Sequence, residues 1–140
     1  TNALTCKGRF TRLEATASGG RLEVAASLKL PARTPFDPAA NGVQVALGDA
    51  AKPGALVQES VTGWSRDRAT VEHQGSASEV VRSLSFTRGR RRAYRMNLAV
   101  AGLEPGELNG RRLVLGVDSG EVCFRRALRC EPHAAAVRCR

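Results

Sequence analysis

Alternation of apolar and polar residues at every second position is the feature that most constrains this chain. It is clearest in residues 21–30, RLEVAASLKL, where Leu22 falls on one side of an extended backbone and Glu23 on the other. Successive side chains of a strand point to opposite faces, so this spacing predicts a strand with one buried face. The preceding segment leads into Ser18-Gly19-Gly20, and we therefore expect a β-hairpin over residues 9–30.

The same period recurs along the rest of the chain. Further strands are predicted at 43–47, 55–61, 69–72, 80–86, 93–100, 111–117, 121–126 and 134–140. Segments rich in Gly, Pro, Asp and Asn separate several of them, at 36–42, 49–54 and 102–110. Only the segment from Glu131 to Val137 has a composition that suits a helix.

About eight or nine short strands with turn signals between them predict an all-β fold with antiparallel pairing. The expected architecture is an immunoglobulin-like β-sandwich of two packed sheets, stapled by disulfides, with a closed barrel as the alternative. A length of 140 residues and 42% hydrophobic composition fit one domain, residues 1–140, with a real core.

Two features bear on the compartment. No stretch approaches 18 uninterrupted apolar residues, so a membrane-spanning helix is not expected. The chain begins at Thr1, and we expect that a signal peptide has been removed and that the protein is extracellular or at the cell surface.

The cysteines strengthen that expectation. They are Cys6, Cys123, Cys130 and Cys139. Their gaps lack the short Cys-x-x-Cys pairs of zinc modules, and neither His73 nor His133 is spaced as a partner, so no metal or other cofactor is predicted. Disulfides of an oxidising compartment are the better interpretation. Three connectivities are possible; the favoured one joins Cys123 to Cys130 locally and Cys6 to Cys139, within one chain or between neighbouring subunits.

Residues 87–95, TRGRRRAYR, form the densest run of charge in a chain that carries a formal +9, with 19 arginines and 3 lysines. The run falls on the predicted turn between strands 80–86 and 93–100. A solvated turn explains it most simply, and contact with a polyanion such as an acidic polysaccharide is the alternative. The candidate residues for that contact are Arg88, Arg90, Arg91, Arg92 and Arg95. Specific recognition of nucleic acid is not expected, because the chain has four Phe, one Trp and one Tyr and no predicted recognition helix.

No motif points to catalysis. A nucleophile elbow requires Gly-x-Ser-x-Gly, and the nearest segment, residues 63–67, lacks the second glycine. Ser65, His73 and Asp67 can be drawn as a triad, but their sequence context does not support one. No catalytic residue and no enzymatic activity are therefore predicted. Trp64 is interpreted either as a core anchor or as a platform on which a ligand stacks.

The two ends of the chain resemble each other. Leu4-Thr5-Cys6-Lys7 and Val137-Arg138-Cys139-Arg140 each place an aliphatic residue two positions before a cysteine and a basic residue after it. This pattern predicts strand-like segments at 1–8 and 131–140 that are available for contact between subunits.

Several short motifs, taken in their order along the chain, suggest a family. They are Phe36-Asp37-Pro38, Asn41-Gly42-Val43, Gly63-Trp64, Cys123, Cys130 and Cys139. In this order they resemble cysteine-containing β-sandwich modules that are repeated in tandem in large secreted proteins of Gram-negative bacteria. The resemblance implies a non-catalytic module with no catalytic residues to carry over.

The sequence therefore favours a non-enzymatic extracellular structural protein. We expect a self-assembling fibre, filament or surface-layer subunit, joined to copies of itself by terminal-strand pairing and locked by bonds between Cys6 and Cys139. The alternative is an extracellular binding module for an acidic polymer or glycan, held through the arginine-rich hairpin.

Overall fold

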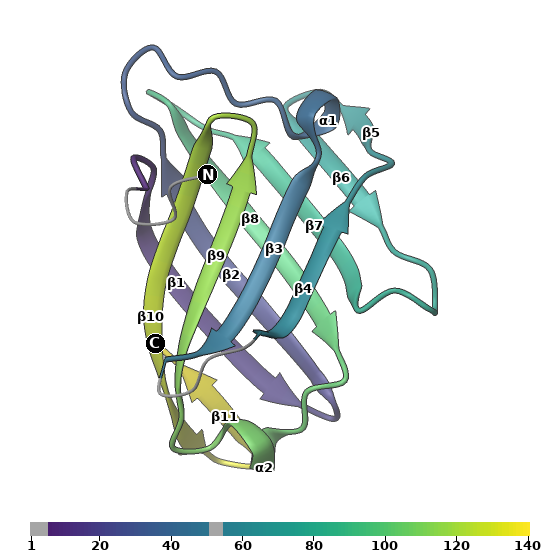
Figure 1. Cartoon of the computed structure of the whole chain (residues 1–140), viewed down its shortest axis with the longest axis vertical. Coiled ribbons are helices and arrows are strands. Elements are labelled where there is room, and N and C mark those ends of the chain that lie inside the picture. Colours follow the sequence, from purple (N-terminus) through teal and green to yellow (C-terminus); the bar gives the residue numbers. More distant parts are fainter. Residues whose placement is uncertain (1–5, 51–54) are drawn as a thin grey trace.

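A computed structural model describes residues 6–50 and 55–140 of the chain. Within these residues the fold is all-β and antiparallel, as predicted, with two one-turn helices (Figure 1). The strands are β1 (Arg9–Ser18), β2 (Arg21–Lys29), β3 (Val43–Asp49), β4 (Ala55–Val61), β5 (Ser65–Asp67), β6 (Thr70–Gln74), β7 (Val81–Arg88), β8 (Ala93–Ala101), β9 (Arg112–Ser119), β10 (Val122–His133) and β11 (Ala136–Cys139). The helices are α1 (Pro38–Asn41) and α2 (Pro105–Leu108).

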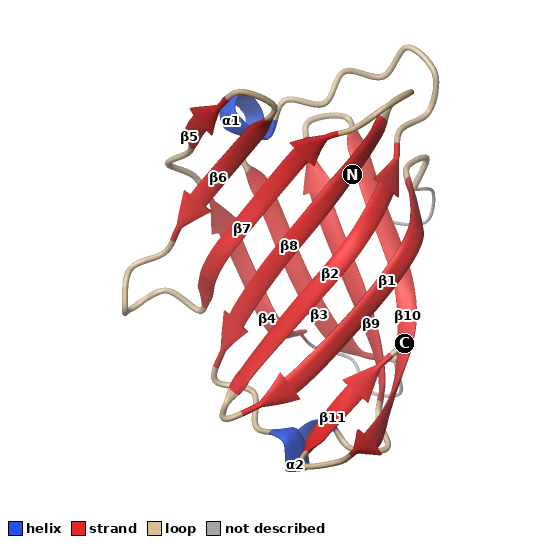
Figure 2. Ribbon diagram, turned by 180° about the vertical axis from the view of Figure 1, so that it is seen from behind, coloured by secondary structure: helices blue, strands red, loops and turns tan. Residues whose placement is uncertain are grey.

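The strands form one continuous sheet rather than the two separate sheets that the sequence predicts. Their order is β4-β3-β9-β10-β11-β1-β2-β8-β7-β6-β5. The sheet folds over on itself as a half-barrel, so that β3 and β9 lie across from β2 and β8 (Figures 1 and 2). The connection is β11, which pairs with β10 on one side and with β1 on the other. Because β11 hydrogen-bonds at both edges, the ladder continues between the two layers instead of breaking into a sandwich.

The alternation in the sequence sets which face of each strand is buried. In β2, Leu22, Val24 and Leu28 are buried while Arg21 and Glu23 face solvent, as the period of two predicts. The inward side chains of all the long strands meet in a single core between the two layers. Its largest fully buried members include Phe86, Phe124, Leu22, Leu28, Leu84 and Met96.

Two disulfides close the side of the half-barrel where β1 faces β10. Cys6 bonds to Cys123 at one end of this side, and Cys130 bonds to Cys139 at the other. The participation of all four cysteines is as predicted, but the favoured pairing is wrong. Cys123 and Cys130 lie on the same strand, β10, and a separation of seven residues corresponds to about 23 Å along it. No disulfide spans that distance.

The pairing that does occur follows from strand register. Cys130 and Cys139 are directly opposite each other in the β10–β11 ladder. Cys6 approaches β10 because the backbone nitrogen of Gly8 donates a hydrogen bond to the carbonyl of Cys123 at 3.1 Å. The Cys6–Cys139 bond that the sequence favoured, within a chain or between subunits, is therefore replaced by two bonds within one chain.

The opposite side of the half-barrel is open, and it lies between the two ends of the sheet, β4 and β5. These two strands follow each other in the chain and are joined by residues 62–64. The gap is bridged by Glu59 on β4, whose Oε2 accepts a hydrogen bond from the backbone nitrogen of Val81 at 2.8 Å.

Residues 131–140 form the end of β10 and the strand β11, which confirms the strand predicted at 134–140. Other local predictions need correction. Strand β5 was not predicted, because all three of its side chains are exposed and it lacks the alternation that marked the other strands. Each one-turn helix lies inside a segment predicted to be a loop, and each has a proline in its first turn.

The two terminal segments predicted for contact between subunits, 1–8 and 131–140, lie in different parts of the fold. Residues 131–140 form the end of β10 and the interior strand β11; β11 is paired at both edges, and the end of β10 is paired with β11. Of the segment 1–8, residues 1–5 lie outside the described residues, and residues 6–8 lie against β10. Among the described residues, none of the helices has the length and apolar character needed to cross a membrane.

Candidate binding site at the arginine-rich end

The arginine run forms a tight turn between β7 and β8, as predicted. The carbonyl of Arg90 accepts a hydrogen bond from the nitrogen of Ala93 at 3.0 Å, and Gly89 donates to the carbonyl of Ala93 at 2.8 Å. The central residues, Arg91 and Arg92, have φ angles of 49° and 63°. Positive φ at both central positions is what a type I′ hairpin turn requires, and Asn-Gly is its preferred sequence.

The left-handed conformation of these arginines is unfavourable. It brings the Cβ atom close to the following carbonyl oxygen, which costs about 1–2 kcal/mol for each residue that is not glycine. Four of the five non-glycine residues with positive φ in the described chain are arginines: Arg33, Arg68, Arg91 and Arg92. All four lie in loops at the same end of the molecule, the upper end in Figures 1 and 2.

Backbone hydrogen bonds hold these loops together. The carbonyl of Arg92 accepts from the nitrogen of Leu30 at 3.0 Å, which attaches the β2–α1 loop to the arginine turn. On the other side, the nitrogen of Arg88 donates to the carbonyl of Ala69 at 2.9 Å, which attaches the β5–β6 turn. Three loops distant in sequence are therefore neighbours at this end.

The basic surface continues onto the outer face of β1, β2 and β8. Arg9 lies opposite Lys29 across the β1–β2 ladder. In the next outward-facing row, Ser27 lies between Arg12 on β1 and Arg95 on β8. All four cations are exposed. The predicted contact residue Arg95 therefore points outward beside the turn, together with three cations that the sequence analysis did not select.

We call these residues the basic end. They are Arg9, Arg12, Lys29, Arg33, Arg66, Arg68, Arg88, Arg90, Arg91, Arg92 and Arg95. They make up half of the 22 lysines and arginines of the chain. Within the described part of the chain, Arg66 is the only one of them in an ion pair; its Nη2 lies 3.5 Å from Oδ1 of Asp37. The basic end therefore carries charge that no carboxylate of the described residues neutralises.

A pocket opens into the basic end, with a volume of about 420 Å³. Arg66, Arg68 and Arg88 line it together with Asp37, and aromatic side chains provide its apolar surface. Arg88 and Tyr94 are directly opposite each other in the β7–β8 ladder, so the predicted contact residue Arg88 lines the pocket beside an aromatic ring.

Phe36 organises the aromatic part of this pocket. Its ring packs edge-on against Phe86, Tyr94 and Phe124, with centroids 5.1, 4.9 and 5.8 Å away. The next residue, Asp37, caps α1 by accepting a hydrogen bond from the nitrogen of Ala40 at 3.2 Å. The cap and the ring contacts together fix the loop that forms one wall of the pocket.

Sequence reasoning identified Arg88 and the turn arginines but missed Arg66, Arg68 and Phe36. The segment 65–69 carries no periodicity, and Phe36 lies in a loop, so nothing local related them to the arginine run. The proximity of Arg66 and Arg68 to it depends on β6 pairing with β7.

Trp64 is placed as a core anchor. It is half-buried against the core, with its ring centroid 6.0 Å from Phe86 and 5.9 Å from His73. Its Nε1 donates to the carbonyl of Val61 at 3.3 Å. The ring and its polar atom are thus both engaged within the protein, and Trp64 does not line the pocket at the basic end.

The residues that could be drawn as a catalytic triad are not assembled. The hydroxyl of Ser65 donates to the carbonyl of Glu72 at 3.3 Å. His73 is buried, with Nδ1 3.0 Å from the carbonyl of Gly63 and Nε2 2.9 Å from the carboxylate of Glu79. Both imidazole nitrogens are therefore occupied by groups that are not part of the triad.

The environment of His73 shifts the pKa of its imidazole. Burial lowers its pKa, but the hydrogen bonds to Gly63 and Glu79 outweigh burial and raise the pKa above the ordinary value of 6.5. The hydrogen bond from His73, followed by one from the nitrogen of Ser76, lowers the pKa of Glu79 below 4.5. These hydrogen bonds tie the loop after β6 to the β4–β5 connection, and they form an ion pair when His73 is protonated.

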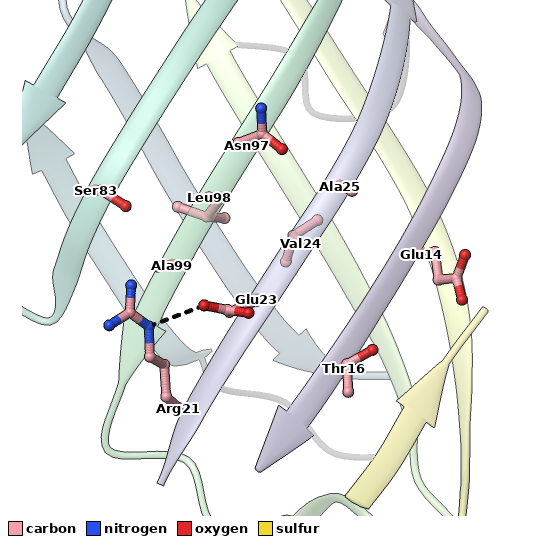
Figure 3. A pocket seen from close by; sticks show the side chains of 10 residues that line it. All are labelled: Glu14, Thr16, Arg21, Glu23, Val24, Ala25, Ser83, Asn97, Leu98 and Ala99. Atoms are coloured by element: carbon pink, nitrogen blue, oxygen red, sulfur yellow. Dashed lines mark ion pairs between the residues drawn. The ribbon is translucent and has the colours of Figure 1, made fainter. Parts of the chain in front are cut away.

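A second hollow, of about 400 Å³, lies on the face formed by β1, β2, β8 and β7 (Figure 3). Small side chains such as Ala25, Ser83 and Ala99 line it. Its charged residues are engaged in ion pairs, Glu23 with Arg21 at 3.4 Å and Glu14 with Arg138 at 3.1 Å. It offers neither an aromatic surface nor unpaired charge, and we regard it as the weaker candidate.

Residues 6–50 and 55–140 contain no group of His, Cys, Asp and Glu side chains arranged to hold a metal ion. The chain matches no protein-family model, no curated protein and no solved structure. The resemblance to tandem secreted modules stays a prediction.

Proposed function

We propose that the protein is a non-enzymatic extracellular binding module that holds an acidic polymer at its basic end. The observation that carries this proposal is the turn at Arg91 and Arg92. A turn selected for stability alone would have Asn-Gly at these positions. Strained residues that are retained at an exposed site cluster at functional sites, where the side chain matters more than the backbone energy.

The charge distribution supports the same conclusion. Half of the basic residues gather on one end, and all of them except Arg66 lack an ion-pair partner among the described residues. Such a surface attracts polyanions over long range, and each bound anionic group releases counterions. Two disulfides are typical of proteins that function in an oxidising compartment, which agrees with an extracellular polymer as the partner.

The test is heparin binding across a salt series, with R91N/R92G as the test variant. This variant removes two charges and supplies the preferred turn sequence, so the fold is retained. The expected result is elution from heparin resin at lower salt, with the slope of log affinity against log salt reduced by about two.

The matched control is R112Q/R129Q. Arg112 and Arg129 are exposed and directly opposite each other across the β9–β10 ladder, where β9 begins at the end of the molecule away from the basic end (Figure 1). This variant has the same net charge as R91N/R92G. Its elution should stay close to that of the wild type. Equal losses in the two variants would show that only net charge matters and would contradict a site at the basic end.

We propose self-association as a second function, through β4 rather than through the terminal segments. Strand β4 ends the sheet, and its Leu56 is one of the two large hydrophobic side chains exposed in the described chain. An edge strand of this kind can pair with a second copy. Light scattering of wild type and of L56K tests it: a monomeric wild type contradicts the proposal, and an oligomer that L56K dissociates supports it.

A further inference from the structure

The pocket at the basic end combines a charged surface with an aromatic one. Arg66, Arg68 and Arg88 supply guanidinium groups at its rim, and Phe36 and Tyr94 supply half-buried aromatic rings. Its volume of about 420 Å³ falls within the range of small-molecule sites, about 300–1,000 Å³. It can therefore enclose part of a polymer rather than only attract its charge.

We propose that this pocket holds one anionic pyranose ring of an acidic polysaccharide, a uronate or a sulfated sugar. The turn arginines Arg90, Arg91 and Arg92 then contact neighbouring anionic groups of the same polysaccharide chain. This inference rests on the proposed function and names the class of polymer that the basic end recognises.

The aromatic side chains of the pocket explain why it would bind a sugar ring. A pyranose presents an apolar face of C–H groups between its hydroxyls, and aromatic side chains in binding pockets pack against such surfaces. Tyr94 also provides a hydroxyl, which has no hydrogen-bond partner among the described residues and can bond to a sugar oxygen.

The charged side chains of the pocket explain why it would bind an acidic sugar rather than a neutral one. Within the described residues, Arg68 and Arg88 have no hydrogen-bonded or ion-paired side-chain partner, and guanidinium groups bind carboxylate and sulfate in bidentate geometry. Asp37 lies in the same pocket and can accept hydrogen bonds from sugar hydroxyls. The phosphodiester backbone of DNA has negative charge but offers no hydroxyl donors to this carboxylate.

The packing of the rings disfavours nucleic acid. Single-stranded nucleic acids bind by stacking bases on open aromatic faces. Phe36 instead packs at 83° against Phe86, at 71° against Tyr94 and at 85° against Phe124. Phe86 and Phe124 are fully buried, so this edge-to-face cluster offers a small sugar ring only the half-buried rings of Phe36 and Tyr94 and gives no flat platform for successive bases.

The experiment compares three small probes by NMR titration: glucuronate, acetate and glucose. Acetate has the charge without the ring, and glucose has the ring without the charge. We expect glucuronate to bind at least about tenfold more tightly than either. Its chemical-shift changes should centre on the amides of Asp37, Arg88 and Tyr94. Binding of acetate as tight as that of glucuronate would overturn the proposal.

Two variants separate the pocket from the turn. Y94F keeps the ring that packs against Phe36 and removes only the hydroxyl, so it should weaken glucuronate binding about three- to tenfold. R91N/R92G should leave glucuronate binding within about threefold of wild type while heparin binding falls. An unchanged affinity for glucuronate in Y94F would contradict the role of the pocket.

Polymer competition completes the test. Inorganic polyphosphate and poly(dT) carry charge without an acidic sugar ring, so at equal charge they should displace heparin less well than polygalacturonate does. Displacement of heparin by poly(dT) at least as effective as that by polygalacturonate would overturn the inference in favour of nucleic acid. A protein that fails to bind heparin at all contradicts the proposed function itself.

Discussion

Glu59 and Val81 bridge the open side of the half-barrel, where the Oε2 atom of Glu59 accepts a hydrogen bond from the Val81 nitrogen at 2.8 Å. The two ends of the sheet are also joined there through the short chain segment 62–64, the contacts of Trp64 and the hydrogen bond between His73 and the carbonyl of Gly63. Side-chain contacts thus perform the role that a strand ladder performs elsewhere in the fold.

Replacing Glu59 should loosen this side of the molecule. In E59L the partly buried nitrogen of Val81 loses its acceptor, and we expect the free energy of unfolding to fall by about 1–3 kcal/mol. E59Q keeps an oxygen acceptor and should lose less. Urea denaturation measures both, with E23Q as the control at an exposed ion pair. Equal stability of E59L and the wild type would contradict the bridging role.

The two disulfides should contribute unequally to stability. Cys6 and Cys123 are 117 residues apart in sequence, and Cys130 and Cys139 are 9 apart. Loop-closure entropy of the unfolded chain then predicts losses of about 5 kcal/mol for C6A/C123A and about 2.5 kcal/mol for C130A/C139A.

Peptide mapping without reduction checks the pairing itself. Trypsin cleaves after Arg125, Arg126 and Arg129 and so separates Cys123 from Cys130. The expected products are one peptide pair that contains Cys6 and Cys123 and another that contains Cys130 and Cys139. A peptide pair that links Cys6 to Cys139 would contradict the structure.

Stability should depend on pH through the His73–Glu79 pair. The pKa of His73 is raised, so its contribution is complete below its unfolded value of 6.5 and is lost as pH rises through the higher folded pKa. The pKa of Glu79 is lowered, so its contribution is complete above 4.5 and is lost as pH falls through the lower folded pKa. The pair therefore stabilises the fold most between pH 4.5 and 6.5.

The variant E79Q tests this. It should flatten the fall in stability above pH 6.5 that urea denaturation records for the wild type. NMR titration should show a lower pKa for His73 in E79Q than in the wild type. A His73 pKa that E79Q does not alter would contradict the ion pair.

Gly8 should resist substitution, because a Cβ atom there would lie 2.4 Å from the ring of Phe124 and 2.9 Å from the carbonyl of Cys123. We expect G8A to reduce the free energy of unfolding by about 1–3 kcal/mol through overpacking. Gly106 is the matched control, since a Cβ there meets nothing within 4 Å. It lies in α2, so thermal unfolding of G106A should show equal or higher stability.

The arginine turn should become more stable when its charges are removed. In R91N/R92G the residues suit the left-handed conformation, and relief of strain should raise the free energy of unfolding by about 1–2 kcal/mol. Thermal unfolding measures this change at the same time as heparin binding declines. A loss of stability in this variant would show that the turn is not strained and would remove the main support for the proposed function.

Much of the fold was predictable from short-range pattern. Leu22 and Glu23 fall on opposite faces of β2 as their alternation predicts, and Gly19 and Gly20 form the predicted turn. The turn at Arg90–Arg92 was also predicted, because alternation flanks it on both sides. The failures are equally specific: β5 lacks alternation, and Cys130 pairs with Cys139 through the register of two adjacent strands, which the spacing of the cysteines does not show.

The sequence by itself determined which faces of the strands are buried and where the chain turns between them, because these properties depend on neighbours along the chain. Only the tertiary structure decided which cysteines are partners, that the strands form one folded sheet, and that Arg68, Arg88 and Tyr94 share a pocket. A period of two encodes the face of a strand but not the identity of the strand beside it. Pairings between distant segments are set by how the whole set of strands packs around one core.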